Sequence, residues 1–200
     1  MTRMAIVIDL DACVGCHACA TVCKQENNVE LGSFWSNVLD IGPTGKFPDV
    51  EMYFLPTLCQ HCDDPVCVKV CPTGASYKRE DGIVLVEKDR CIGCQYCVVA
   101  CPYGVRVYNH EAGVVEKCTL CAHRVDAKDE PACVKTCVAK ARTFGDLDDP
   151  NSEVSRKIRD AGNDVHRLED LGNGPSVAYI LRKQTWKSQE KRTSQKHLAR

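Results

Sequence analysis

Residues 91–101 read Cys-Ile-Gly-Cys-Gln-Tyr-Cys-Val-Val-Ala-Cys, and Pro102 follows them. The same spacing, C-x2-C-x2-C-x3-C, recurs at residues 13–23, and two stretched forms of it lie at residues 59–71 and 118–137. All sixteen cysteines of the chain therefore fall into four groups of four, with none left over. The groups are Cys13, Cys16, Cys19 and Cys23; Cys59, Cys62, Cys67 and Cys71; Cys91, Cys94, Cys97 and Cys101; and Cys118, Cys121, Cys133 and Cys137.

This spacing is suited to iron–sulfur chemistry. A short loop with thiols at steps of three can wrap around a cubane, presenting thiolates to three irons while its N–H groups point at the sulfides. By the fourth cysteine the chain has entered a helical turn, so that thiol faces a different cluster, as in bacterial ferredoxins. We therefore expect four 4Fe-4S clusters, built in pairs, with all sixteen cysteines as ligands.

Two other uses of cysteine fit the sequence less well. Disulfide scaffolds belong to secreted proteins, but residues 1–10 lack the apolar run and cleavage site of a signal peptide. Structural zinc sites also use paired C-x2-C elements, yet seldom a C-x2-C-x2-C run with a distant fourth cysteine. No window reaches the ~18–20 apolar residues of a membrane span. We therefore expect neither a signal peptide nor a transmembrane segment.

The composition agrees with a globular chain stabilised by metal. Hydrophobic residues make up 44% of the 200 residues but aromatic residues only 6%, so bound clusters are expected to help hold the core. The formal net charge is −1, which gives no reason to expect a nucleic-acid partner. Sixteen thiolates and four cores of about +2 each would make the loaded chain ~8 units more negative. Lys24, Lys117 and Lys135 adjoin the cysteine groups and are candidates to offset that charge.

Other residues beside the cysteines have candidate roles. His17, His61 and His123 could tune cluster potentials through hydrogen bonds, with ordinary surface or packing roles as an equal alternative. Gly15 and Gly93 lie between the first two cysteines of their groups. There a side chain would crowd the cluster, and the turn is expected to need a positive φ.

The segments around the cysteines predict an α+β fold of short β-hairpins and short helices. Residues 5–8 and 51–55 are expected to be strands that enter cysteine loops. Hairpins are predicted from residues 75–78 with 83–86, and from residues 105–108 with 114–117. Helical turns are predicted at residues 20–25 and 98–101.

The organisation predicted is two ferredoxin-like units nested in sequence. Cys71-Pro72-Thr73-Gly74 is repeated as Cys101-Pro102-Tyr103-Gly104, which marks one two-cluster unit at residues 50–109. If every cluster borrows its fourth ligand, residues 1–30 plus 110–147 form the second two-cluster unit. Residues 31–49 are then an insertion, and residues 148–200 a polar, basic extension that docks on a partner.

Two cysteine-free stretches complete the chain. Residues 25–56, which contain Phe34 and Trp35, are too long for a simple connection. They either cover clusters, dock a partner or form an ordered surface insertion with its own small apolar cluster. Residues 182–200 are expected to be solvated or to wrap around a partner. They carry Lys183, Lys187, Lys191, Arg192 and Lys196 against one acid, Glu190.

Five stretches of the chain, spanning roughly residues 4–147, resemble the four-cluster iron–sulfur (beta) subunits of the molybdopterin oxidoreductase (DMSO reductase) family. The resemblance is to the polysulfide, thiosulfate, dimethyl sulfoxide and arsenate reductase type. Its motifs are Asp-Leu-Asp-Ala-Cys-Val-Gly-Cys at residues 9–16, the cysteine runs with their Cys-Pro endings at residues 59–75 and 91–103, Lys-Cys-Thr-Leu-Cys at residues 117–121, and Arg-Thr-Phe-Gly-Asp at residues 142–146. One departure is Val138, where the family often has proline.

The resemblance implies the ligand pairing and the partners. It would group Cys13, Cys16 and Cys19 with Cys137; Cys118, Cys121 and Cys133 with Cys23; Cys59, Cys62 and Cys67 with Cys101; and Cys91, Cys94 and Cys97 with Cys71. It further implies a large molybdopterin (Mo or W) catalytic subunit, which alone would hold the molybdopterin cofactor. A quinone-linked membrane anchor subunit or a soluble carrier would stand at the other end of the electron path.

The function expected is relay of single electrons, without catalysis by the chain itself. No Ser-His-Asp set, phosphate loop or open metal site is evident in the sequence. An electron-transfer subunit of a hydrogenase or formate dehydrogenase complex and a free polyferredoxin are the alternatives. The chain would be exported with a partner that carries a twin-arginine signal and be peripheral to the membrane, or stay in the cytoplasm. Longer family members carry a C-terminal anchor, whereas this chain ends in charged residues.

Overall fold

A four-stranded sheet brings distant parts of the chain together. In the computed structural model, which describes residues 2–182, its strand order is β8 (Arg142–Asp146), β1 (Met4–Asp9), β10 (Ala178–Ile180) and β9 (Val165–His166). Strand β1 pairs antiparallel with β8 and parallel with β10, so the first strand is central. It contains the strand predicted at residues 5–8, which is confirmed.

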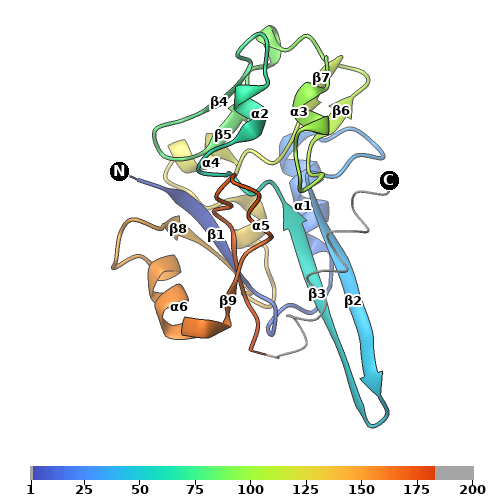
Figure 1. Cartoon of the computed structure of the whole chain (residues 1–200), viewed down its shortest axis with the longest axis vertical. Helices are drawn as coiled ribbons and strands as arrows, with labels where there is room; N and C mark the ends of the chain where they lie inside the picture. Colours follow the sequence, from blue (N-terminus) through green and yellow to red (C-terminus); the bar gives the residue numbers. More distant parts are fainter. Residues whose placement is uncertain (1, 183–200) are drawn as a thin grey trace.

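The two faces of this sheet bury different cores. Val7, Ala178 and Ile180 point to one face, where they pack with Val154 of helix α6 (Glu153–Ala161). The residues that alternate with them, Ile6 and Tyr179 among others, face the cysteine-rich part of the chain. Figure 1 shows α6 on the outer side of the sheet.

The predicted polar extension differs from the structure in its described part. Residues 177–181 read Val-Ala-Tyr-Ile-Leu and are each 2% exposed or less, because they supply β10 and its flanks to the sheet. A short unbroken apolar run is typical of a strand buried on both faces, but the polar residues around it hide this signal. Residues 183–200, with the five basic residues and Glu190 named above, lie outside the described part.

A long hairpin includes most of the predicted insertion, residues 31–49, and extends beyond it. Strands β2 (Ser36–Lys46) and β3 (Asp49–Leu58) pair along their length, so the predicted boundary between residues 49 and 50 falls at the hairpin tip. The strand predicted at residues 51–55 lies within β3 and is confirmed. Near the body of the molecule, Trp35, Leu55 and Leu58 belong to the same core as Ile6, so no separate apolar cluster forms. The tip projects away from the body (Figure 1).

Short hairpins and helices surround the cysteines. Both predicted hairpins are confirmed, as antiparallel β4 (Ser76–Lys78) with β5 (Val84–Val86), and β6 (Val107–Asn109) with β7 (Val114–Glu116). Helix α1 (Ala18–Asn27) contains the turn predicted at residues 20–25, and α3 (Tyr96–Val99) begins two residues before the one predicted at 98–101. The remaining helices are α2 (Val66–Lys69), α4 (Ala122–Asp126) and α5 (Ala132–Lys135), with 3-10 turns at Lys88–Arg90 and Gly162–Asp164.

The mixture of short helices and strands confirms the α+β class. Hairpin β6–β7 crosses the boundary predicted between residues 109 and 110, and Val115 of β7 packs with Cys67 and Cys97 of the middle region. Within residues 2–182, no helix has both the length and the apolar character needed to cross a bilayer.

Candidate metal centres

The structure gathers thiols from distant groups around three separate cavities. None of the sixteen cysteines is in a disulfide. The first cavity is lined by three cysteines of the first group and the last cysteine of the fourth group. We call these four residues, Cys13, Cys16, Cys19 and Cys137, the first set. The second cavity is lined by the second set, which is Cys23, Cys118, Cys121 and Cys133. The third cavity is lined by Cys71, Cys91, Cys94 and Cys97, which we call the fourth set.

The remaining thiols form the third set, which is Cys59, Cys62, Cys67 and Cys101. These thiols lie close enough for the charge of one to raise the pKa of another. Burial, and after it the negative charges of Cys59, Cys67 and Cys101, raise the pKa of Cys62 to about 12. Burial also raises the pKa of Cys101, and Cys59 and Cys67 act in the same direction. These four thiols therefore lie within electrostatic reach of one another.

Short helices direct the thiols of each group into two sites. In every group the third cysteine lies inside a short helix: Cys19 in α1, Cys67 in α2, Cys97 in α3 and Cys133 in α5. The fourth cysteine follows one turn later and belongs to the set of another group. Before α1 and α3, His17 (φ 57°) and Gln95 (φ 60°) take the left-handed conformation, which turns the cysteine loop into the helix.

Gly15 and Gly93 lack room for a side chain because of neighbouring protein atoms, not because of the cavities. Gly15 and Gly93 have φ of +65° and +66°, as predicted. A Cβ at Gly15 would lie 2.5 Å from the Phe54 ring, and one at Gly93 would lie 2.4 Å from the carbonyl oxygen of Gly113. A side chain at either position would thus collide with Phe54 or Gly113, which pack over the two loops, and not with a bound cluster as predicted.

Seven of the thiols have a pKa above the usual cysteine range, and burial is the largest cause in each case. Burial raises the pKa of Cys23 to about 12, and the nearby Cys133 and Cys121 add to the effect. Burial raises the pKa of Cys118 well above its usual range, with Cys23, Cys133 and Cys59 acting in the same direction. Mutually repelling thiolates of this kind are stabilised when a positively charged group binds between them.

Cys59 is a contrasting case among the buried thiols. Burial opposes its ionisation, but His61, Lys117 and Arg106 outweigh burial and lower the pKa of this thiol to about 5. His61 is buried, and its Nδ1 accepts a hydrogen bond of 3.0 Å from the Val84 N–H. Burial lowers the pKa of His61 itself, although the neighbouring Cys59 opposes that shift.

The other two candidate histidines lie at the surface. His17 is exposed at the edge of the first cavity, and His123 is exposed and pairs through Nε2 with Glu26 at 2.8 Å. Of the three histidines, only His61 is buried among the thiols.

The three candidate lysines separate in the same way. Lys24 binds the carbonyl oxygens of Glu30 and Ser33 at 2.8 and 2.7 Å, and Lys135 pairs with Asp129 at the surface. Lys117 is buried, and its Nζ donates to the carbonyl oxygens of Cys118, at 2.8 Å, and Val84. Lys117 is therefore the lysine placed to offset charge at the thiols.

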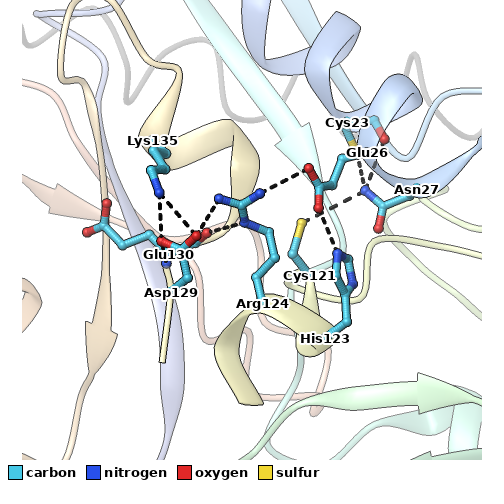
Figure 2. Close-up of polar contacts among 9 residues, drawn as sticks. All are labelled: Cys23, Glu26, Asn27, Cys121, His123, Arg124, Asp129, Glu130 and Lys135. Carbon is cyan, nitrogen blue, oxygen red and sulfur yellow. Dashed lines mark hydrogen bonds and ion pairs between the residues drawn. The ribbon is translucent and has the colours of Figure 1, made fainter. Parts of the chain in front are cut away.

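A polar network fixes the helices around the second set (Figure 2). Arg124 of α4 lies between Glu26 of α1, at 3.1 Å, and Asp129, at 2.6 Å, and Asp129 in turn holds Lys135 of α5 at 3.0 Å. Beside this network, Asn27 Nδ2 donates to the sulfurs of Cys23 and Cys121 at 3.7 and 3.8 Å. Asn27 had no signal in the sequence, because its position depends on how α1 meets α4.

Two buried arginines at the thiols were also missed as site residues. Arg142 donates to the sulfurs of Cys19, at 3.3 Å, and Cys133, at 3.4 Å. Arg106 is buried among the third and fourth sets, where the thiolates of Cys67 and Cys97 favour its charge. A signal was available, since Cys101–Arg106 and Cys137–Arg142 share the spacing C-x4-R.

The described C-terminal part contacts the loop of the third set. Ser176 Oγ donates to the His61 carbonyl at 2.9 Å, and Tyr179 O–H donates to the Pro56 carbonyl at 3.1 Å. Gln60 Nε2 donates to the Tyr179 oxygen at 3.4 Å. Strand β10 thereby connects the four-stranded sheet to the Cys59 loop.

Comparison with known proteins identifies the domain type of this chain and several relatives. Two models of a 4Fe-4S dicluster domain match the chain, over residues 12–75 and 50–147. A Halobacterium salinarum chain named as an iron–sulfur subunit of dimethyl sulfoxide reductase is 46% identical, over 90% of this chain and 79% of the relative. For a sulfite dehydrogenase subunit of Allochromatium vinosum the identity is 45%, over 92% and 85%. For an arsenate respiratory reductase iron–sulfur subunit of Shewanella sp. it is 40%, over 89% and 96%.

The two dicluster matches together span every cysteine of the chain, and the likeness to the relatives extends over most of its length. The chain thus carries 4Fe-4S dicluster domains and acts in electron transfer. It belongs to the family of iron–sulfur subunits of reductase and dehydrogenase complexes.

Proposed function

We propose that the chain binds four 4Fe-4S clusters, one at each cysteine set. In this proposal it relays single electrons between a molybdopterin (Mo or W) catalytic subunit and a quinone-linked membrane subunit or a soluble carrier. A bound cluster of this type takes up and releases one electron at a time. The observation that carries the proposal is that three separate cavities are each lined by four free thiols from distant parts of the sequence.

The thiol sets fit a group larger than one ion. In each of the three cavities the four sulfurs line the wall of a shared space and come from two different cysteine groups. A single zinc ion would need four sulfurs converging at ~2.3 Å from one point. Within the described residues, no three His, Cys, Asp or Glu side chains are arranged to hold one metal ion. This spacing supports clusters over zinc as the bound group.

The ligand sets proposed follow the cavities and the third set. Cluster 1 would be held by Cys13, Cys16, Cys19 and Cys137; cluster 2 by Cys23, Cys118, Cys121 and Cys133; cluster 3 by Cys59, Cys62, Cys67 and Cys101; and cluster 4 by Cys71, Cys91, Cys94 and Cys97. The nested organisation is supported by the pairing of Met4 with Asp146, which joins the two ends of the outer unit. Because β7 packs on the middle region, the boundary of the inner unit is better drawn after residue 116 than after residue 109.

The partners are proposed from two observations. The relatives are named as subunits of complexes, which implies that a separate subunit carries out the chemistry. Cys16 of the first set and Cys94 of the fourth set are exposed, so partners could approach a cluster at each of these sites. The chain would be non-catalytic alone. A hydrogenase or formate dehydrogenase partner would change the metal of the catalytic subunit and leave the role of this chain intact.

The test is metal analysis of the complex isolated without oxygen. We expect sixteen irons per copy of this chain in addition to any iron of the partner, and molybdenum or tungsten in a much larger co-purifying subunit. Nickel would identify the hydrogenase alternative, and an isolated monomer that retains its clusters would favour the free polyferredoxin. Far fewer than sixteen irons, with no paramagnetic signal at low temperature after reduction, would contradict the proposal.

A further inference from the structure

Three buried cations recur at the contacts between thiol sets. Arg142, Lys117 and Arg106 are 5%, 2% and 4% exposed. Long basic side chains are seldom buried so completely unless negative charge is near. Within residues 2–182, none of the three forms an ion pair with a carboxylate. The thiol sets are therefore the negative charges that these cations face.

Arg142 joins the first set to the second. Its Nη2 donates to Cys19 of the first set at 3.3 Å, and its Nη1 donates to Cys133 of the second set at 3.4 Å. A further bond, to Ser36 Oγ at 3.3 Å, fixes the planar group. Burial opposes the charge of Arg142, but the thiolates of Cys133 and Cys19 outweigh it and raise the pKa of the guanidinium.

Arg106 occupies the matching position between the third and fourth sets. It is the fifth residue after Cys101, as Arg142 is after Cys137, and it also donates to a serine hydroxyl, Ser76 Oγ at 2.9 Å. Burial opposes its charge, but Cys67 and Cys59 of the third set and Cys97 of the fourth set raise the pKa of Arg106. The two arginines thus repeat one arrangement in the two halves of the molecule.

Lys117 lies between the two halves. Its Nζ is fixed by the carbonyl oxygens of Val84 and of Cys118, a residue of the second set. The Val84 N–H in turn donates to Nδ1 of His61, two residues after Cys59 of the third set, at 3.0 Å. The two sets approach each other here, since Cys59 and Cys118 are both buried in the same core cluster. One cation therefore occurs at each of the three junctions along the series of sets.

We propose that Arg142, Lys117 and Arg106 are positioning residues for electron relay, each holding a fixed positive charge between two consecutive clusters. The inference rests on the proposed binding of four clusters. A reduced cluster carries one more negative charge than an oxidised one, so a shared cation stabilises the electron on either of its two neighbours. Because each cation serves two clusters, removing it should alter a defined pair of potentials.

The experiment replaces Lys117 by methionine, which keeps the length of the side chain and removes its charge. The loaded chain, purified anaerobically with its partner, is analysed for iron and then titrated against potential by paramagnetic resonance. We expect full iron content and a shift of two clusters to lower potential. At a fixed potential their ratio of reduced to oxidised form should fall about tenfold, which for one electron is ~59 mV. Lys117→Arg should restore the potentials, and Lys46→Met, which removes an exposed lysine at the tip of the β2–β3 hairpin, should change none.

The outcomes separate this inference from the proposed function. Full iron with all four potentials unchanged in Lys117→Met would overturn the role of Lys117 while leaving the four clusters in place. Low iron in the unsubstituted chain would instead contradict the four-cluster proposal. If Lys117→Met loses iron, Lys117→Arg and Arg142→Lys decide, because they keep the charge. Wild-type potentials in both would support the inference, and shifted potentials in chains that keep the charge would overturn it.

Discussion

The outer half of the cysteine system consists of the first and second sets, and the inner half of the third and fourth sets. The two halves use nearly the same cysteine spacing but are covered by different elements of the fold. The outer sets lie beneath the four-stranded sheet and the base of the β2–β3 hairpin, which contributes Val38 and Pro56 to the first cavity. The inner sets lie beneath the small hairpins β4–β5 and β6–β7, at the end of the molecule opposite the hairpin tip (Figure 1). The spacing fixes the order of the thiols, and long-range packing decides what surrounds them. The same substitution should therefore have different effects in the two halves.

The largest effect is expected from cysteine exchange, which tests whether each half pairs as proposed. Cys23→Ala and Cys118→Ala should abolish the same paramagnetic signal, because both thiols line the second cavity. Cys19→Ala, although it lies in the same helix as Cys23, should abolish a different signal. Each variant should lose about a quarter of the iron or retain a three-iron cluster.

The inner half provides the matched control for this exchange. Cys71→Ala and Cys91→Ala should abolish one common signal, and neither should alter the signal lost in Cys23→Ala. If Cys23→Ala and Cys19→Ala instead removed one and the same signal, each sequence group would hold its own cluster and the proposed pairing would be wrong.

The next effect concerns the stability of the two repeated loops. Gly93→Ala should destabilise the protein more than Gly15→Ala, although both residues need a left-handed conformation that costs alanine ~1–3 kcal/mol. The added methyl group at residue 93 meets the backbone of Gly113, whereas at residue 15 it meets the ring of Phe54, which can move. Thermal unfolding of the loaded protein should show a lower midpoint for both variants, and the lower of the two for Gly93→Ala.

A double substitution sharpens this comparison. Phe54→Ala removes the ring that blocks residue 15, so Gly15→Ala should cost less in that background than in the unsubstituted chain. The same background should leave the cost of Gly93→Ala unchanged, because the two sites are covered by different elements. Equal costs for Gly15→Ala in both backgrounds would show that the ring does not contribute to the strain.

Much of the cysteine-rich region could be predicted from the sequence, because its structure is set by short-range spacing. The thiol loops, the hairpins around residues 79–82 and 110–113, and the strand at residues 5–8 each depend on a few consecutive residues. The sheet could not be predicted in this way. Strand β10 is three residues long, which is too short for a periodic pattern, and it joins β1 across more than 160 residues of sequence.

The positions of the cations at the thiols also depend on long-range packing and could be predicted only in part. Lys117 could be selected because it precedes a cysteine, but Lys24 and Lys135 have equivalent sequence positions and bind elsewhere. Arg106 and Arg142 lie five residues beyond the nearest cysteine, and only the hydrogen-bonded turn after that cysteine returns them to the sulfurs. Proximity in sequence was therefore a poorer guide to the site than the repeat of the C-x4-R spacing.

A smaller effect is expected where the sheet meets the inner half. Tyr179→Phe removes the hydroxyl that donates to the Pro56 carbonyl and accepts from Gln60, in a place where both partners are buried. Gln60 Nε2 keeps its bond to the Leu58 carbonyl at 2.9 Å, but the buried Pro56 carbonyl loses its bond from the hydroxyl, which should lower the free energy of unfolding by ~1–3 kcal/mol. Because Gln60 follows Cys59, the third set should also lose iron to a chelator faster, while the fourth set is unaffected. Equal rates of loss from both sets would contradict this link.

The smallest effect is expected from Asn27, which distinguishes the halves at the level of single hydrogen bonds. Asn27 donates its side-chain amide to two sulfurs of the second set, which also receives the Leu120 N–H. The fourth set receives the N–H groups of Ser76 and Val115 and has the Thr73 hydroxyl 3.7 Å from Cys71, but no side-chain amide donates to it within the described residues. Hydrogen bonds to ligand sulfur stabilise the more negative, reduced state, so Asn27→Ala should lower the potential of one outer cluster only.

The size of that shift can be bounded by the cations. The bonds from Asn27 are 3.7 and 3.8 Å long and its amide is neutral, so the change in the ratio of reduced to oxidised cluster should stay below the tenfold change expected for Lys117→Met. Asn37→Ala, at an exposed position on β2, is the matched control and should change no potential. If Asn27→Ala also shifted the potential of an inner cluster, the two halves would not be independent, and the comparison between them would fail.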